Sequence, residues 1–307
     1  MSARAWIAFA AVSVLWGVPY FFIKLAVEDG VSPAFVAWSR VVIGAAVLLP
    51  VAWRRGALFG LARRWRALAA FALLEITIPF PLIAAGEQRI SSSLTAILVA
   101  ALPLTMALVA PRFDPTAERV DGPRLGGLLV GLAGVVLLLG VDVAGRPAEL
   151  VGAGLVLLAT MGYAVGPLVV RRHLADVDPL GPVAGALGVA SVYLAPAALL
   201  SAPERLPAAE ALVSLLVLGV ACTALAFVFF FALIAEAGPA RATVIAYVAP
   251  TVAVALGVAV LGESLTAASV AGLLLILAGS WVSTGGRLPP GLAAVARRRP
   301  APGPTGP

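Results

Sequence analysis

The stretch from Arg241 to Leu265, RATVIAYVAPTVAVALGVAVLGESL, decides the fold of this chain. It begins at an arginine and stays apolar, with Pro250 inside it, until Gly262 and Glu263. A helix that crosses the hydrocarbon core of a bilayer needs about 20 predominantly apolar residues. We therefore predict that this stretch crosses a membrane.

A degenerate copy of the stretch lies in the first half of the chain. The segment Ser93–Val109, SLTAILVAALPLTMALV, places Pro103 147 residues before Pro250. Further on, Glu118 precedes a glycine-rich apolar run, as Glu263 does, at an offset of 145 residues. We interpret the chain as one unit written twice.

The composition excludes several classes of protein. Of the 307 residues, 62% are hydrophobic and 12% are charged, whereas a soluble domain carries roughly 25% charged residues. The net charge of +6 does not indicate a nucleic-acid partner, because the arginines cluster between apolar runs. One cysteine and one histidine exclude a disulfide framework and a recognisable zinc site, so we predict neither metal nor cofactor.

Ten apolar spans separated by turn residues predict an all-α integral membrane protein. They cover residues 5–27, 33–53, 66–86, 91–111, 124–141, 149–170, 179–200, 211–235, 241–261 and 265–285. Residues 5–141 form the first five-span repeat, and residues 149–285 form the second. We expect residues 286–307, rich in proline, glycine and arginine, to be a disordered basic cytoplasmic tail.

The arginines between the spans predict the orientation. With a cytoplasmic N-terminus, sixteen arginines lie on the cytoplasmic side and three, Arg89, Arg146 and Arg205, lie on the other. Basic loop residues favour the cytoplasm, so we expect both termini on the cytoplasmic side of the inner membrane. Because each repeat has an odd number of spans, the second inserts with the opposite polarity. Such inverted repeats are typical of secondary transporters.

Several short motifs occur in order along the chain. Leu15–Arg40 reads LWGVPYFFIKLAVEDGVSPAFVAWSR and includes Trp16-Gly17, Lys24 and Ser32-Pro33; Arg241–Ser283 includes Pro250, Leu261-Gly262-Glu263 and Gly272. Together, over residues 5–285, they resemble the EamA-type family of the drug/metabolite transporter superfamily. The resemblance implies ten helices around a central cavity that opens to either side, and movement of small metabolites. The chain departs from the family pattern at Thr116-Ala117-Glu118 and at Gly162-Tyr163.

Three ionisable residues lie clearly inside the spans: Lys24, Arg40 and Glu75. Each costs roughly 2.5–3.5 kcal/mol at a helix centre on insertion scales, so such residues pair or face a wet cavity. Glu75 either binds a substrate amine or a coupling proton, or forms a structural ion pair with Arg40 or Lys24. Arg40 either holds a substrate carboxylate or fixes its helix to Glu75 or to a carbonyl. Lys24 contributes to the path or reaches the lipid headgroups.

Aromatic and proline residues inside the spans give further candidates. Trp16 and Tyr163 occupy equivalent places in the two repeats and, like Tyr247, either line a cavity or pack between helices. We assign hinge or gate roles to Pro79, Pro81, Pro103 and Pro250, with static bends as the alternative.

We predict structural roles for several glycine and polar residues: helix packing, helix capping and the ends of turns. The glycine pairs, Gly127 and Gly131 among them, favour close helix packing in one chain, with a homodimer seam as the alternative. Ser91–Ser93 caps the fourth span. Glu118 and Glu263 end short turns.

These features predict a secondary transporter of small organic metabolites such as amino acids or related amphipathic compounds, acting by alternating access, and the family resemblance implies export. The chain has no phosphate-binding loop, so an ion gradient or the solute's own gradient supplies the energy. An enzyme is disfavoured, since no nucleophile–base pair or metal motif is present. The alternative function is a lipid flippase or a non-transporting membrane assembly partner. The expected partners are the solute, membrane lipid and a coupling proton.

Overall fold

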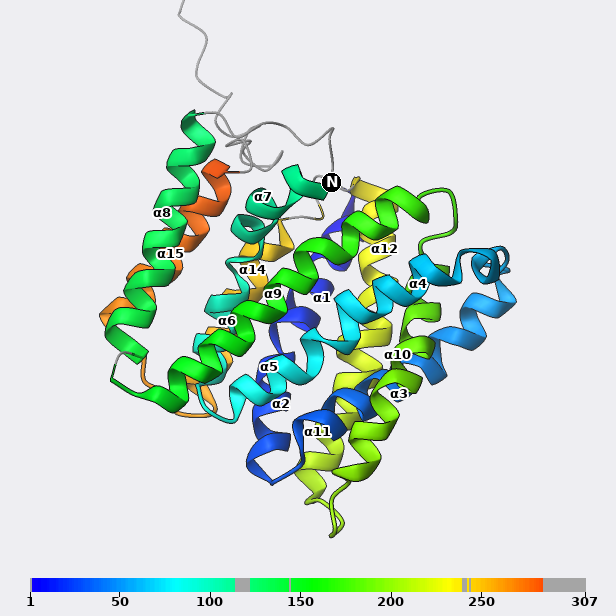
Figure 1. The fold of residues 1–307 in the computed structure, drawn as a ribbon, viewed down its shortest axis with the longest axis horizontal. Helices are drawn as coiled ribbons and strands as arrows, with labels where there is room; N and C mark the ends of the chain where they lie inside the picture. The colour runs from blue at the N-terminus through cyan, green and yellow to red at the C-terminus, as the bar shows by residue number, and fades with distance from the viewer. Residues whose placement is uncertain (1, 114–121, 144, 239–241, 243, 284–307) are drawn as a thin grey trace, which may run out of the picture.

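The computed structural model describes residues 2–113, 122–143, 145–238, 242 and 244–283 (Figure 1). Within these ranges the chain is helical, with no strand. The all-α prediction is confirmed. The predicted tail, residues 286–307, and Glu118 lie outside the described residues.

The helices follow the predicted apolar runs closely. Their bounds are α1 Ala3–Gly17, α2 Pro19–Glu28, α3 Pro33–Arg54, α4 Trp65–Ala72, α5 Pro79–Glu87, α6 Ser92–Val99, α7 Leu102–Phe113, α8 Gly122–Leu138, α9 Pro147–His173, α10 Leu180–Leu200, α11 Ala209–Gly219, α12 Ala226–Ala237, α14 Ile245–Ala259 and α15 Ala267–Ser283. A 3₁₀ turn, Leu61–Arg64, precedes α4. Three π-helical segments, Leu73–Thr77, Leu139–Val143 and Val220–Leu225, interrupt the longer runs.

Eight helical runs in the described residues, some with a short break or a π segment inside them, are long and apolar enough to cross a membrane. They are Ala3–Glu28, Pro33–Arg54, Leu61–Glu87, Ser92–Val109, Gly122–Val141, Pro147–His173, Leu180–Leu200 and Ala209–Ala237. The last two apolar helices, α14 and α15, are shorter. Within the described part of Arg241–Leu265, the long helix covers residues 245–259, and the count of ten spans stays a prediction.

The four prolines predicted as hinges lie in different local backbone geometries. Pro79 begins α5 directly after a π segment, and Pro103 follows a break between α6 and α7 at residues 100 and 101. Pro81 lies in the first turn of α5, where no helical hydrogen bond is lost. Pro250 lies inside α14, which continues through it. The matched prolines therefore differ in local geometry, and their gate role stays a prediction.

Glycine lets α8 and α15 approach closely, side by side at one edge of the molecule (Figure 1). A Cβ on Gly127 would lie 2.9 Å from the carbonyl oxygen of Gly279, and one on Gly134 would lie 2.8 Å from that of Gly272. A Cβ on Gly131 would overlap Leu104. The glycine stripe is thus used within one chain, as the packing interpretation predicts.

The remaining packing is repeated in the two halves of the chain. The helix α1 packs against α12 and α14 of the second half, and α9 packs against α5 and α7 of the first half. The helices α3 and α10 pack on each other. The π segments that precede α5 and α12 begin at residues 73 and 220, which are 147 residues apart, as Pro103 and Pro250 are.

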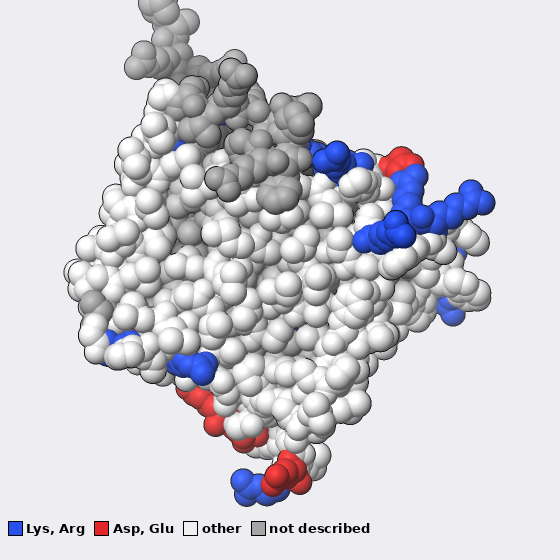
Figure 2. All heavy atoms as spheres, in the orientation of Figure 1, with Lys and Arg blue, Asp and Glu red and all other residues white. Residues whose placement is uncertain are grey.

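The charged side chains on the visible face lie near the helix ends. Figure 2 shows lysine, arginine, aspartate and glutamate at opposite edges of the visible face, with a broad uncharged band between them. Large apolar side chains such as Leu129, Leu132 and Leu274 are more than half exposed in this structure. Contiguous exposed apolar surface marks a membrane or protein contact, and a band between two charged edges fits a bilayer.

Candidate functional site

Four polar side chains from both halves of the chain lie together inside the spans. They are Tyr20 on α2, Arg40 on α3, Glu75 in the first π segment and Tyr163 on α9. Tyr163 is within electrostatic reach of Arg40, Tyr20 and Glu75. Each of the four residues keeps partial exposure in the structure. We call them the interior polar group, and it contains three of the predicted site residues.

Arg40 is held by the second half of the chain. Its Nε donates a hydrogen bond to Thr223 Oγ1 at 2.8 Å, and its Cζ lies 4.2 Å from the centre of the Phe80 ring. Thr223 lies in the second π segment and donates in turn to the carbonyl oxygen of Leu218. Among the described residues, the two terminal nitrogens of the guanidinium donate to no partner. The planar fork that binds carboxylates in a bidentate way is therefore free.

Glu75 has no ion-pair partner among the described residues, so the predicted pair with Arg40 or Lys24 is wrong. Its Oε2 is buried and accepts no hydrogen bond. The carboxyl packs on α9 at Gly166, where any Cβ would overlap Oε2. Glu75 lies in the π segment Leu73–Thr77, and such segments are frequent at functional sites.

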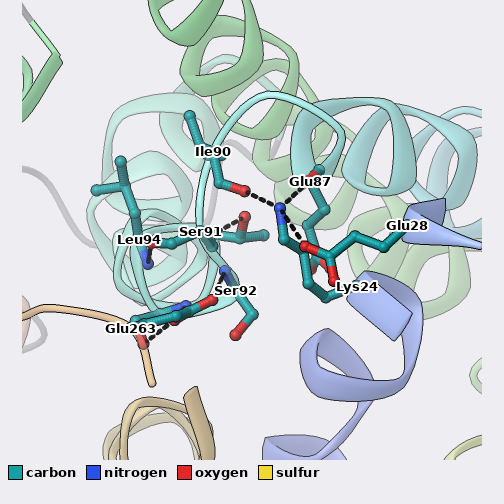
Figure 3. Close-up of polar contacts among 10 residues, drawn as sticks. Lys24, Glu28, Glu87, Ile90, Ser91, Ser92, Leu94 and Glu263 are labelled. Carbon is teal, nitrogen blue, oxygen red and sulfur yellow. Dashed lines mark hydrogen bonds and ion pairs between the residues drawn. The ribbon is translucent and has the colours of Figure 1, made fainter. Parts of the chain in front are cut away.

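Lys24 is a residue of α2, and its ammonium lies at the turn between α5 and α6, apart from the interior polar group. Its Nζ donates to the carbonyl oxygens of Glu87 at 2.8 Å and Ile90 at 3.2 Å, and lies 3.5 Å from Glu28 Oε1 (Figure 3). The interpretation that Lys24 reaches the headgroups is therefore wrong. The ammonium instead satisfies free carbonyls at the C-terminus of α5, where a cation is favourable.

Glu263 holds the other side of the same turn. Its carboxylate accepts hydrogen bonds from the backbone N–H of Ser92 at 2.7 Å and of Ser93 at 2.9 Å, and from the hydroxyl of Ser93 (Figure 3). Burial raises the pKa of Glu263, but the hydrogen bonds from Ser93 and Ser92 outweigh it, and the net pKa lies below the ordinary value. Ser91 caps α6 by accepting from Leu94 N–H, which confirms the predicted serine cap.

The residues around this turn form what we call the α5–α6 cluster: Lys24, Glu28, Glu87, Ile90, Ser91, Ser92, Ser93 and Glu263. A hollow of about 430 Å³ lies beside it, lined in part by Lys24, Glu28, Ser93 and Glu263. Glu87 is fully buried, and neither of its carboxylate oxygens has a hydrogen-bond partner. Two carboxyls in the described chain, Glu75 and Glu87, thus carry buried oxygens without partners.

The other predicted site residues lie elsewhere. Trp16 packs against Phe227 and Phe230 of α12, with ring centres 5.7 and 4.7 Å away. Tyr247 lies in the first turn of α14 and is half-buried. Trp16 therefore makes a packing contact, whereas Tyr163, its counterpart in the second repeat, belongs to the interior polar group.

A second hollow, of about 740 Å³, lies at the opposite helix ends, between the start of α4 and the end of α9. Arg64 and Asp176 form an ion pair on its rim, and this hydrogen bond lowers the pKa of Asp176 to about 2. Both side chains are at least one-third exposed. The pair ties the turn before α4 to the turn after α9. Both side chains face solvent, so we do not place the solute site here.

Sequence reasoning missed Tyr20, Glu87, Thr223 and the role of Glu263. Glu87 was missed because the predicted third span ended at residue 86, one residue too early, which placed its carboxyl in a loop. Tyr20 and Thr223 carry no charge and gave no signal. Glu263 has its partners 170 and 171 residues away, and local sequence does not indicate them.

Known proteins match this chain over almost its whole length. The model of the EamA-like transporter family matches residues 4–140 and 150–285. The uncharacterized inner membrane transporter YedA of Escherichia coli K12 is 30% identical, over 84% of this chain and 83% of the relative. The uncharacterized transporter YvbV of Bacillus subtilis is 27% identical, over 89% of each chain.

A solved chain described as "Crystal structure of protein" has the same fold, with a TM-score of 0.63 and 21% identity, covering 97% of this chain and 100% of the other. At that identity the likeness concerns the fold alone. The family match covers both halves of the sequence, and both of these relatives are named as transporters, YedA as one of the inner membrane. The chain therefore belongs to the EamA-like transporter family and is a multi-pass membrane transporter.

Proposed function

We propose that the protein is a secondary transporter of the inner membrane that moves small organic metabolites by alternating access. In this proposal it has ten spans, arranged as two inverted five-span repeats over residues 5–141 and 149–285. The crossed packing of α1 with α12 and α14, and of α9 with α5 and α7, supports it. A two-fold relation between the halves predicts this exchange of partners, because each first helix packs on the other half.

The main support for a solute site is the way in which the Arg40 guanidinium is held. Thr223 and Phe80 fix its guanidinium, and its two terminal nitrogens have no described partner. A fixed arginine with a free fork binds a carboxylate at a lower entropic cost than a mobile one. Tyr163 and Tyr20 place hydroxyl groups in the same region, and Glu75 supplies a carboxyl for an ammonium group or a proton.

This arrangement favours a solute with one carboxylate and an apolar or cationic part, such as an amino acid or a related amphipathic compound. Arg40 is the one basic residue of the interior polar group, and a highly phosphorylated solute would require more. An ion gradient, most simply a proton gradient, or the solute gradient drives the movement. By family resemblance, we propose export as the direction.

Both termini lie in the cytoplasm in this proposal. Lys24 then belongs to the outer end of the path, and Trp16, Tyr247 and the prolines at 79, 81, 103 and 250 contribute to packing changes between states. Because Gly127 and Gly131 pack on α15, that stripe is not available for a homodimer. Labelling of single cysteines in the loop at residues 143–147 tests the orientation: access from the same side as both termini contradicts it.

The test is uptake by the purified full-length protein in liposomes, with a panel of amino acids and amphipathic amines, with and without a pH gradient. We expect at least one carboxylate solute to accumulate above the level in protein-free liposomes. The variant Arg40→Gln should lose about tenfold or more, since a charge-assisted hydrogen bond contributes about 1.5–3 kcal/mol. The control Arg89→Gln, at an exposed turn, should keep wild-type uptake. Equal uptake by the two variants would show that Arg40 does not bind the solute.

A further inference from the structure

Glu87, the last residue of α5, is enclosed without a partner. Its exposed fraction is 0%, and neither carboxylate oxygen accepts a hydrogen bond. The nearby ammonium of Lys24 is already engaged with the carbonyl oxygens of Glu87 and Ile90 and with the carboxylate of Glu28. An ammonium has three donors; two of those of Lys24 bind carbonyl oxygens, and neither oxygen of the Glu87 carboxyl accepts the third.

The charges that face Glu87 nearly balance. Lys24 and Glu28 act on it from α2, Arg40 from α3 and Glu263 from the turn after α14, so two cations oppose two carboxylates. Tyr20 on α2 also interacts with it. The neighbouring face of α9 is uncharged, with Gly152 and Val156 against Gly86. No net positive charge therefore compensates for burial of an ionised carboxylate, and burial favours the neutral form.

We propose that Glu87 is a proton-binding site, distinct from Glu75, that carries its proton at neutral pH when the α5–α6 cluster is assembled. The enclosed carboxyl excludes a metabolite. In the described residues no group of three His, Cys, Asp or Glu could hold a metal ion. A proton needs neither the space that a metabolite occupies nor the additional ligands that a metal ion requires.

The position of Glu87 links this proton to the turn between α5 and α6. When the carboxyl releases its proton, the O–H bond breaks, the proton passes to water and a carboxylate remains beside Lys24. The ammonium then leaves the carbonyl oxygens of Glu87 and Ile90 and pairs with the carboxylate, which removes the cation from the end of α5. The binding of the proton stands by itself; only its use in coupling rests on the proposed transport.

Infrared spectroscopy of the full-length protein in lipid tests this site without any solute. The carbonyl stretch of protonated carboxyl groups is recorded while the pH is varied, for the wild type and for Glu87→Gln, Glu75→Gln and Glu204→Gln. At neutral pH we expect Glu87→Gln to lose a part of the wild-type band equivalent to one proton per chain. Glu204→Gln, which removes an exposed carboxyl outside the α5–α6 cluster, should keep the band. An unchanged band in Glu87→Gln would overturn the proposal.

A second variant keeps the test decisive if Glu87→Gln does not fold. Removing a neighbouring cation disfavours the carboxylate, so Lys24→Met should move the titration midpoint of the band to higher pH. Arg89→Met, an exposed cation on the following turn, should leave the midpoint in place. A midpoint that is unchanged in Lys24→Met contradicts the proposal. Liposomes that transport nothing would refute the transport function and leave this band intact, so the two failures are distinguishable.

Discussion

Two glutamates at contacts between the halves of this protein have opposite environments. Glu263 accepts three hydrogen bonds at the start of α6, whereas Oε2 of Glu75 is buried in the first π segment and accepts none. The start of a helix offers free N–H groups, but inside a span the backbone donors are already used. The comparison shows that a carboxylate at the start of a helix gains structural hydrogen bonds, whereas the carboxylate of Glu75 inside a span keeps a buried oxygen that accepts none.

The largest expected effect is on transport, from Glu75. If its carboxyl carries a coupling proton, Glu75→Gln keeps the shape but cannot titrate, and uptake driven by a pH gradient in liposomes should be abolished. Binding of the solute, measured separately, should persist, because Arg40 is unchanged. Proton-dependent uptake at the wild-type level in a folded Glu75→Gln protein would show that Glu75 is structural, and the contrast with Glu263 would fail.

A smaller effect is expected from the surface on which Glu75 packs. A methyl group at Gly166 would overlap Oε2 of Glu75 and lie 3.2 Å from its Cβ. Gly166→Ala should therefore lower stability by about 1–3 kcal/mol, as overpacking does. Gly154→Ala on the same helix meets nothing within 4 Å and is the matched control. Thermal unfolding in detergent measures both, and equal melting temperatures would contradict the close contact.

Glu263 should affect stability and not the chemistry of transport. Glu263→Gln keeps the shape but loses the charge that strengthens three hydrogen bonds, so we expect a loss of about 1–2 kcal/mol, reduced by the partial exposure of the site. Glu149→Gln, which breaks an exposed pair with Arg146, should change stability by less than about 0.5 kcal/mol. A Glu263→Gln protein as stable as the Glu149→Gln protein would refute the cap.

The difference between wild type and Glu263→Gln should depend on pH in a defined direction. The pKa of Glu263 is lower in the folded protein than its ordinary value, because of the hydrogen bonds from Ser92 and Ser93. Its stabilisation is therefore complete above the unfolded pKa of about 4.3 and is lost as the pH falls through the lower folded pKa. Melting temperatures of the two proteins should converge below that pH. A constant difference down to strongly acidic pH would contradict this linkage.

The smallest effect is expected at the opposite helix ends. Asp176 has a pKa of about 2 because Arg64 donates hydrogen bonds to it, but the pair lies in solvent. Exposed ion pairs contribute little to stability. Asp176→Asn should leave the melting temperature within experimental scatter at neutral pH and in high salt. A clear drop would mean that this pair, like Glu263, holds the helix ends together.

Charge inside an apolar run was the signal that predicted most of the interior polar group. Arg40 and Glu75 were visible because ionisable residues are costly there, and Tyr163 was found from its register with Trp16. The same method failed at Glu87, since a shift of one residue in a predicted helix end moves a carboxyl from membrane to loop. For Lys24 it offered only the solute path or the lipid headgroups, because carbonyl partners 63 and 66 residues away leave no local trace.

By itself, the sequence determined that the chain is helical and apolar, where its breaks fall, and that it repeats at an offset near 147 residues. Those are local properties, since the length and polarity of a segment decide whether it can be a span. Only the tertiary structure decided that Arg40 binds Thr223, 183 residues away, and that Glu263 caps α6. Hydrogen-bond partners depend on which helix ends meet in space, and helices in a bilayer are brought together by packing along their whole surfaces.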